Sequence, residues 1–278
     1  MSDVLKGKRA LVTGGGSGIG LGSALALAAD GATVTLMGRT ADKLNAAAES
    51  IRSTVAGAEV HTFAGDVCNE ADVVAAVETA GGEAGLDICV AAAGDGTVGP
   101  IAVMPIEEWN RVLGVSLTGV FLTIKAASAS MMRGGRGGSI VAISSLAGNL
   151  THKWMGPYCV AKAGVDMLVK VSADEMGVAE IRVNAVAPGI IETDLVAMVT
   201  PDTSVGQSYL RESPLSRFGQ VEHVAPLVRF LAGPESAHIT GAIVPVDGGQ
   251  HLRAGPDYEE FARMLYGEAV DGKLPAPE

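Results

Sequence analysis

Short apolar runs alternate with longer helical patterns from one end of this chain to the other. In the longer segments the apolar residues recur at spacings of three and four, as they do along one face of a helix. Alternation of this kind is typical of repeated β-α-β units, whose strands pair in parallel and are buried on both faces. The sequence therefore predicts an α/β protein with a doubly wound, mainly parallel sheet of about seven strands.

The runs that we interpret as strands are almost wholly apolar, and they are Arg9–Thr13, Thr33–Met37, Glu59–Ala64, Asp87–Ala92, Ser139–Ser144, Arg182–Ala187 and Ile243–Val246. The segments with a helical period are Ile19–Asp30, Ala41–Val55, Glu70–Ala80, Ile106–Met132, Tyr158–Met176 and Val221–Leu231. Right-handed crossovers would place these helices on both faces of the sheet.

The pattern continues without a linker almost to the end of the chain, so residues 1–255 are predicted to form a single domain. A Pro-Asp pair then favours the start of a short helix, with Tyr258, Phe261 and Leu265 on one face. We interpret residues 256–278 as a C-terminal helical tail. Its apolar face is expected to pack against another surface, either of its own domain or of a neighbouring subunit.

Charge and hydropathy argue against several classes of partner. The formal net charge is −11, and no run of lysines or arginines offers a surface to nucleic acid or anionic lipid. The N-terminus lacks the apolar stretch of a secretory signal, and no apolar run approaches the roughly 18 residues of a membrane span. We therefore expect neither a nucleic-acid partner nor a membrane.

The cysteines bear on the cellular compartment. Cys68, Cys89 and Cys159 are odd in number, follow no metal-ligand spacing and stand in apolar contexts. We interpret them as reduced core thiols of a cytoplasmic protein, and we predict no metal site.

A glycine-rich turn, TGGGSGIG at residues 13–20, joins the first strand to the first helix. Backbone can approach a pyrophosphate closely only where side chains are absent, and the amides at a helix start bind its charge. A nucleoside-triphosphate loop would instead place Lys and Ser/Thr after the last glycine, where this chain has Leu21 and Gly22. The turn therefore predicts a Rossmann-type dinucleotide site whose cofactor contacts are Gly14, Gly16, Ser17, Gly18, Ile19 and Gly20.

Tyr158 and Lys162 are four residues apart in a predicted helix, so their side chains project from the same face. A nearby ammonium would lower the pKa of the tyrosine from its ordinary value of about 10 and make it a usable proton donor and acceptor. The alternative is an ordinary surface pair.

Taken together, these motifs resemble those of the short-chain dehydrogenase/reductase family from about residue 8 to residue 249. The family's landmarks occur in order: TGGGSGIG at 13–20, Asp66-Val67, AAAG at 91–94, ISS at 143–145, Tyr158 and Lys162, Pro188-Gly189, Thr193 and VDGG at 246–249. The resemblance implies an oxidoreductase that moves a hydride between a nicotinamide cofactor and an alcohol or ketone. Residues 1–255 would then form both its dinucleotide-binding and its catalytic domain.

The resemblance also implies the roles of single residues. Tyr158 would exchange a proton with the substrate oxygen, Lys162 would also hold the nicotinamide ribose, and Ser145, thirteen residues before the tyrosine, would polarise that oxygen. The further cofactor contacts would be Asp66, Val67, Ala93, Gly94, Pro188, Gly189, Ile191 and Thr193. For Asp66 the alternative is a helix N-cap. The family resemblance and the apolar helices 106–132 and 158–176 also predict a homotetramer.

Two departures qualify the match. Ala91 and Ala92 occupy positions where the family usually has Asn-Asn, and Ser116 stands where it has a catalytic Asn. Ser116 would either replace that Asn imperfectly, by holding a water in a proton relay, or merely pack in its helix. The departures motivate a rival function: a dinucleotide-binding protein of this fold with weak or no catalysis, acting by interaction or regulation.

The choice of cofactor depends on the end of the second strand, where an acidic residue binds the ribose 2′-hydroxyl of NAD. This chain has Gly38 and Arg39 there, and the arginine could bind a 2′-phosphate. We predict NADP, with NAD as the alternative if the arginine only stacks on adenine. Apolar residues of the segment 192–218, with Trp154 and Met155, suggest an apolar alcohol or ketone substrate.

Overall fold

The parallel sheet that the apolar runs predict forms the centre of the molecule. The computed structural model describes residues 3–273, in which seven parallel strands follow the order β3-β2-β1-β4-β5-β6-β7. The strands are β1 (Arg9–Thr13), β2 (Thr33–Gly38), β3 (Val60–Ala64), β4 (Ile88–Ala91), β5 (Gly138–Ile143), β6 (Ile181–Pro188) and β7 (Ile243–Val246). The interior strands β1, β4, β5 and β6 are buried along nearly their whole length, which explains their apolar sequences.

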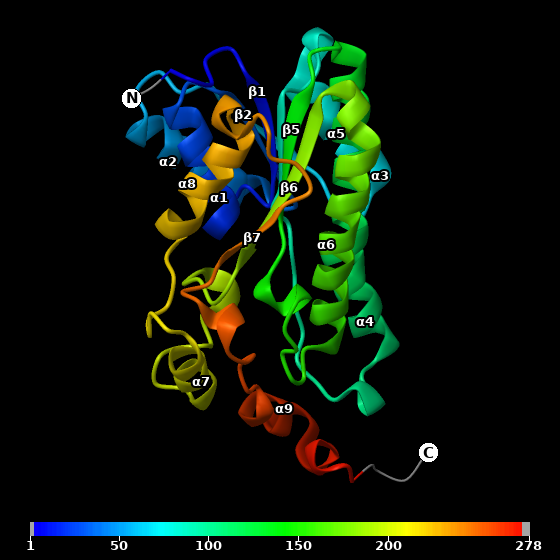
Figure 1. Cartoon of the computed structure of the whole chain (residues 1–278), viewed down its shortest axis with the longest axis vertical. Helices are drawn as coiled ribbons and strands as arrows, with labels where there is room; N and C mark the ends of the chain where they lie inside the picture. The colour runs from blue at the N-terminus through cyan, green and yellow to red at the C-terminus, as the bar shows by residue number, and fades with distance from the viewer. Residues whose placement is uncertain (1–2, 274–278) are drawn as a thin grey trace.

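Helices cover both faces of this sheet (Figure 1). One face carries α1 (Gly18–Ala29), α2 (Ala41–Thr54) and α8 (Val221–Ala232), and the other carries α3 (Glu70–Gly81), α5 (Gly119–Gly134) and α6 (Gly156–Met176). Each layer buries its own apolar core, with Leu27 and Leu36 in the first and Met131 and Val165 in the second. The predicted doubly wound α/β fold is confirmed.

Short 3-10 turns join these elements, at Gly82–Ala84, Ile101–Val103, Leu146–Gly148, Gly177–Ala179, Asp194–Val196, Pro234–Ser236, Gln250–Leu252 and Gly267–Asp271. The chain returns to the middle of the sheet between β3 and β4, because β1 pairs with β2 on one side and with β4 on the other. The strand order reverses at this point, and the crevice that results at the carboxyl ends of β1 and β4 is where sheets of this kind bind ligands.

The long helix predicted at Ile106–Met132 is interrupted. It consists of α4 (Ile106–Leu113), a π-helical segment (Gly114–Thr118) and α5. A π-helical turn adds a residue to the turn and so changes which side chains face inward beyond it. The segment is therefore helical throughout, as predicted, but its middle, where Ser116 lies, is a π-helical turn and not α-helix.

The same helical segment bears on the membrane. By length and composition Ile106–Gly134 could cross a bilayer, with a mean hydropathy of 1.6 in its most apolar stretch, although polar residues interrupt its apolar runs. In the structure 56% of that stretch is buried inside the protein, where α5 packs against α3 and the sheet. This core packing accounts for the buried part of its apolar composition.

Two helices lie beyond the carboxyl ends of the strands, α7 (Ser204–Glu212) and α9 (Glu259–Tyr266) (Figure 1). α7 falls in the segment that the sequence left without a helix. α9 packs on α7 of the same chain, with Tyr258 and Ala262 buried, whereas Leu265 is 65% exposed and does not share the buried face predicted for it. The division into a domain of residues 1–255 and a tail stays a prediction, and residues 274–278 of that tail lie outside the described part.

Candidate active site

A cleft of about 500 Å³ opens at the carboxyl ends of the strands. The predicted cofactor contacts that line it are Gly14, Gly16, Ser17, Gly18, Ile19, Gly20, Arg39, Asp66, Val67, Ala93, Gly94, Pro188, Gly189, Ile191 and Thr193. Ser145, Tyr158 and Lys162 line it as well, whereas Ser116 does not reach its surface. The fold thus brings together residues that are up to 179 positions apart in the sequence (193 − 14 = 179).

The glycine turn is packed so tightly that side chains would not fit. A Cβ on Gly14 would lie 2.8 Å from the amide nitrogen of Ala93, and one on Gly20 would lie 2.2 Å from the carbonyl oxygen of Gly14. The turn ends at the start of α1, where Ser17 makes no side-chain cap and leaves the first amides available to an anion. This cradle fits the pyrophosphate of a dinucleotide.

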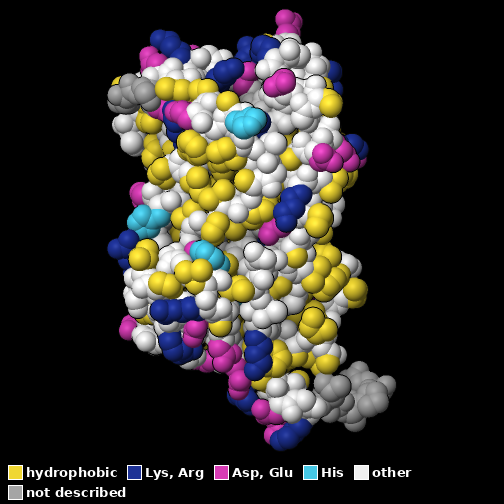
Figure 2. Space-filling model, viewed as in Figure 1, with side chains coloured by type: hydrophobic (Ala, Val, Ile, Leu, Met, Phe, Trp, Pro, Cys, Tyr) yellow, Lys and Arg dark blue, Asp and Glu magenta, His cyan; other side chains and the backbone are white. Residues whose placement is uncertain are grey.

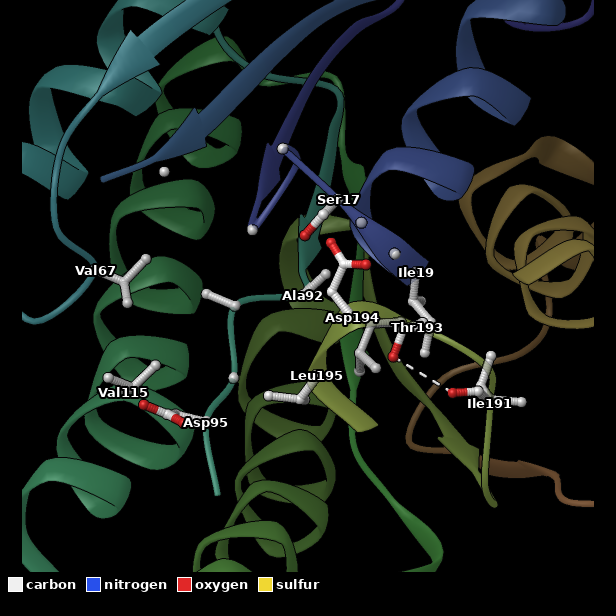
Figure 3. A pocket seen from close by; sticks show the side chains of 18 of the residues that line it. Ser17, Ile19, Val67, Ala92, Asp95, Val115, Ile191, Thr193, Asp194 and Leu195 are labelled. Carbon is white, nitrogen blue, oxygen red and sulfur yellow. Dashed lines mark hydrogen bonds between the residues drawn. The ribbon is translucent and has the colours of Figure 1, made fainter. Parts of the chain in front are cut away.

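The segment after β6 forms the opposite wall of the cleft. Figure 3 shows Ile19 from α1 and Thr193, Asp194 and Leu195 from this segment around the same opening. The Thr193 hydroxyl donates a hydrogen bond to the main-chain oxygen of Ile191 at 3.4 Å, and a Cβ on Gly18 would lie 3.1 Å from Cγ2 of Thr193. The two walls therefore come close together beside the glycine turn.

The end of the cleft at β2 carries two cations. Arg39 and Lys43 are exposed on its lining, and within residues 3–273 neither forms an ion pair. Asp66 lies across from them, where its Oδ1 accepts a hydrogen bond from the amide of Cys68 at 2.9 Å. The alternative role of Asp66 as the N-cap of α3 was wrong, because Asn69 caps that helix by accepting from Ala71.

The ammonium of Lys162 is buried at the other end of the cleft. Its Nζ donates a hydrogen bond to the main-chain oxygen of Ile143 at 2.8 Å and lies 5.6 Å from the centre of the Tyr158 ring. Burial lowers the pKa of Lys162 to about 8, and the carboxylate of Asp166, one turn further along α6, offsets part of the fall. The side chain can therefore change its charge near neutral pH.

Tyr158 lies beside this lysine, but its electrostatics differ from the expectation. The sequence predicted that the ammonium would lower the pKa of Tyr158, whereas burial raises it and a hydrogen bond with the Ser145 side chain offsets part of the rise. The prediction was wrong because the cost of burying the phenolate outweighs the effect of an ammonium that lies over the ring.

Two neighbouring serines at the end of β5 point in different directions. Ser145 lines the cleft, bonds with Tyr158 and accepts a hydrogen bond from the amide of Ala147 at 3.1 Å. The hydroxyl of Ser144 donates instead to the carboxylate of Asp166. Successive residues of an extended chain face opposite ways, so this geometry favours Ser145 over Ser144 as the serine that meets a substrate.

Ser116 is fully buried in the π-helical segment. Its hydroxyl donates to the carbonyl oxygen of Asp95 at 2.7 Å and accepts from the amide of the same residue at 2.8 Å. A Cβ on Gly94 would lie 3.7 Å from the Nζ of Lys162 and 3.9 Å from the Oγ of Ser116. Ser116 thus fastens the chain after β4 directly beside the lysine.

Sequence reasoning missed two charged residues of this region, Lys43 and Asp166. Each follows an assigned residue by four positions, Arg39 and Lys162 respectively, so helical spacing could have identified both. Within the described residues no three His, Cys, Asp or Glu side chains come together as metal ligands do. The side chains of Tyr158, Ser145 and Lys162 bring a phenol, a hydroxyl and an amine to this end of the cleft.

Comparison with known proteins gives the class to which this arrangement belongs. The model of the family described as enoyl-(acyl carrier protein) reductase matches residues 14–251. The trans-4-hydroxycyclohexanecarboxylate dehydrogenase of Sinomonas cyclohexanicum is 38% identical over 255 residues, which cover 90% of this chain and 95% of that protein.

Solved structures agree with the sequence comparison. A short-chain type dehydrogenase/reductase from Mycobacterium ulcerans has a TM-score of 0.92 at 40% identity and covers 97% of this chain and 99% of its own. A chain from Agrobacterium tumefaciens with bound NADP has a TM-score of 0.81 at 32% identity and covers 90% of this chain and 99% of its own.

The chain belongs to the short-chain dehydrogenase/reductase family, as its motifs predicted. It is an oxidoreductase for an alcohol or ketone, and its family uses NAD or NADP. The rival function without catalysis finds no support among the relatives.

The buried lysine predicts how stability depends on pH. Between its folded pKa of about 8 and the ordinary 10.5, the unfolded chain binds a proton that the folded protein has lost. The contribution of Lys162 to the free energy of unfolding therefore rises with pH through this window. Relative to Lys162→Met, the wild type should gain about 1 kcal/mol of stability between pH 7 and pH 9, measured by urea unfolding.

Lys170→Met is the matched control, because Lys170 is exposed on the same helix. A wild-type protein whose stability relative to Lys162→Met stays constant over this range would show that the lysine is not desolvated.

Proposed function

We propose that the chain is an NADP-dependent alcohol dehydrogenase or ketone reductase in which Tyr158 is the general acid and base. One observation carries the proposal: Ser145, Tyr158 and Lys162 meet at one end of a cleft whose other end holds the glycine turn and Arg39. A dinucleotide in this cleft would have its phosphates at the turn and its nicotinamide beside Tyr158.

Each residue then has a defined task. The cofactor supplies or accepts the hydride at the carbon that bears the substrate oxygen. Ser145 and Tyr158 hydrogen-bond that oxygen, and Tyr158 donates its proton to it in reduction or removes the proton in oxidation. Burial favours the protonated phenol, which is the form that reduction requires.

Lys162 has two tasks in this proposal. Its ammonium stabilises the phenolate that forms when Tyr158 gives up its proton, and it binds the hydroxyls of the nicotinamide ribose. The hydrogen bond to Ile143 fixes the ammonium while leaving two of its three N–H groups for these contacts. The carboxylate of Asp166 favours the charged form of the Lys162 amine, although this amine is buried.

The role of Ser116 in a proton relay also remains a proposal. Its hydroxyl proton and one lone pair bond with Asp95, so one lone pair is left to accept a hydrogen bond from a water. The Asn that usually stands here would offer a second polar atom. We propose that Ser116 acts mainly as a positioning residue that holds Gly94 and Asp95 beside Lys162.

Tyr158→Phe tests the general acid. The variant keeps the ring and its packing but loses the transferable proton, so kcat should fall by two or more orders of magnitude. Dinucleotide affinity, measured by cofactor fluorescence, should stay within a few-fold of the wild type. Near-normal turnover by this variant would refute the role of Tyr158, and tight cofactor binding by a wild type without turnover would revive the non-catalytic alternative.

The preference for NADP rests on the charges at the end of β2. Arg39 and Lys43 are available there, and Gly38 brings no carboxylate to repel a 2′-phosphate. Arg39→Ala should lower the ratio of kcat/KM for NADP over NAD by tenfold or more, and Lys43→Ala should lower it less, because lysine makes a single-point contact. Arg133→Ala, which removes an exposed arginine of α5, is the control; a wild type that prefers NAD would contradict the proposal.

The remaining proposals concern substrate and location. Trp154, Met155 and Leu210 pack against one apolar cluster that includes residues of α7, which supports a substrate with an apolar body. Cys68, Cys89 and Cys159 are free thiols, in keeping with the proposed cytoplasmic location. The prediction that all three are core thiols was wrong, because only Cys89 is buried, whereas Cys68 is exposed and Cys159 is half-buried.

We also propose a homotetramer. Apolar side chains on α5 and α6 remain exposed in the single chain: Phe121, Val160, Met167 and Val171 are each 45% exposed or more. Figure 2 shows apolar side chains along the edge of the molecule where α6 and α4 lie in Figure 1. Burial between copies would remove this area from water. Light scattering should give four times 28.1 kDa, and a monomer mass would refute the proposal.

A further inference from the structure

The segment that follows β4 passes both Lys162 and Tyr158. A Cβ on Gly94 would lie 3.7 Å from the Nζ of Lys162. One on Gly96 would lie 3.7 Å from Cδ2 of Tyr158. Asp95, between the two glycines, lines the cleft. The main chain of this segment is therefore part of the wall against which the lysine and the tyrosine lie.

Side chains hold this segment in place. Within residues 3–273 no main-chain group elsewhere bonds with the main chain of Asp95 or Gly96. The amide and the carbonyl of Asp95 bond with the Ser116 hydroxyl, and the amide of Gly96 donates to the Asp95 carboxylate at 2.8 Å. The carbonyl of Gly96 accepts a hydrogen bond from Arg111 at 3.1 Å. The position of the segment therefore depends on side chains of the neighbouring helix.

Arg111 on α4 makes two of these contacts. Its guanidinium donates both to the carboxylate of Asp95 and to the carbonyl of Gly96. Its Nε and one terminal nitrogen also donate to the two carboxylate oxygens of Glu108, which precedes it by three residues on α4, at 3.1 and 2.8 Å. Because a guanidinium is planar, this two-point contact with Glu108 fixes its orientation. Glu108 thus orients Arg111 toward the segment after β4.

The π-helical turn accounts for the fact that one helix supplies both holding side chains. Arg111 and Ser116 are five positions apart (116 − 111 = 5), and in a regular α-helix such residues point about 140° away from each other. The π-helical segment Gly114–Thr118 begins between them and adds a residue to the turn. Both side chains therefore reach Asp95, which Figure 3 shows beside Val115.

The ion pair of Arg111 and Asp95 is partly open to water. The side chain of Arg111 is 39% exposed and that of Asp95 is 27% exposed. An ion pair screened in this way contributes little to the free energy of unfolding. A displacement of reacting groups by about 1 Å, in contrast, can lower a rate by about 100-fold. We therefore expect Arg111 to affect turnover more than stability.

We propose that Arg111 is a positioning residue for the reaction. Through Asp95 and Gly96 it holds the main chain after β4, and this main chain aligns the phenol and the ammonium for proton transfer. Arg111 does not line the cleft, so it acts without touching substrate or cofactor. This inference rests on the proposed function of the site.

Arg111→Met tests the proposal, because methionine keeps an unbranched side chain on α4 but makes none of the guanidinium's hydrogen bonds. The measurement is the single-turnover rate of hydride transfer from NADPH to the fastest ketone among cyclohexanone, cyclopentanone and acetophenone. This rate should fall by about tenfold, while KM for the ketone and Kd for the cofactor stay within about twofold. A rate within about twofold of the wild type would overturn the proposal.

Stability is measured on the same variant. The midpoint of thermal unfolding of Arg111→Met should fall by no more than about 3 °C, as expected for a partly exposed ion pair. A single-turnover rate constant does not depend on how much of the enzyme is folded, so it separates alignment from stability. A large fall in the midpoint with an unchanged rate constant would mean that Arg111 is structural, and would overturn the proposal.

Two further variants locate the effect. Arg111→Lys keeps the charge and can make one of the contacts, so its rate should exceed that of Arg111→Met by about threefold. Asp95→Asn removes the ion pair but can still accept from the amide of Gly96. The combined loss in Arg111→Met with Asp95→Asn should be smaller than the product of the two single losses, because both variants break the same contact. Equal rates for the lysine and methionine variants, or losses that simply multiply, would overturn the proposal.

Arg133→Met is the matched control, because Arg133 is an exposed arginine at the far end of the same helical segment. It should keep the wild-type rate, and a loss equal to that of Arg111→Met would overturn the proposal.

The two proposals fail differently. A wild type whose turnover depends on Tyr158 but not on Arg111 would overturn only the role of Arg111. Absence of turnover on every ketone with either cofactor would overturn both.

Discussion

The carboxyl edge of the parallel sheet is the constraint on which the site depends. Because neighbouring strands run in the same direction, the ends of β1, β4, β5 and β6 meet along one edge, and each delivers residues to the same cleft. The approach of β1 to β4 is so close that only a glycine fits at position 14. Because glycine has no side chain, the ends of the two strands can approach each other, and space remains for the phosphates of a dinucleotide.

At the end of the cleft that holds Tyr158 and Lys162, electrostatics lower the stability of the folded protein. Burial disfavours both the ammonium of Lys162 and the phenolate of Tyr158, the two charged forms that proton transfer needs together. Asp166 and the carbonyl of Ile143 stabilise the first, and Ser145 stabilises the second. Each supporting group offsets only part of the cost. The pKa of Lys162 therefore falls to about 8, so this amine can change its charge near neutral pH, whereas burial keeps Tyr158 in its neutral phenol form.

The sequence could predict the parts of the molecule that repeat or that follow a fixed spacing. Apolar runs gave every strand within a few residues, and the order of motifs gave the family and the lining of the cleft. The π-helical turn at Ser116 was not predicted, because its extra residue shifts the apolar period by only one position within a segment that is apolar on both sides. The pKa of Tyr158 was wrong in direction, since the depth of burial depends on packing that spacing alone does not contain. α7 was missed because its nine residues include glycine and serine.

The features that the sequence did not predict lie mostly beyond the carboxyl ends of the strands. Strands and helix starts form the end of the cleft proposed for the cofactor, and their geometry tolerates few residue types. The part proposed for the substrate is formed by α7, the loop of His152 and the segment of Tyr258. These pieces pack mainly on one another, so their residues can vary without disturbing the sheet. The ligand that such a wall selects therefore depends on the few polar atoms that its packing leaves without a hydrogen bond, and among the buried side chains of the described residues that atom is the uncharged indole nitrogen of Trp154.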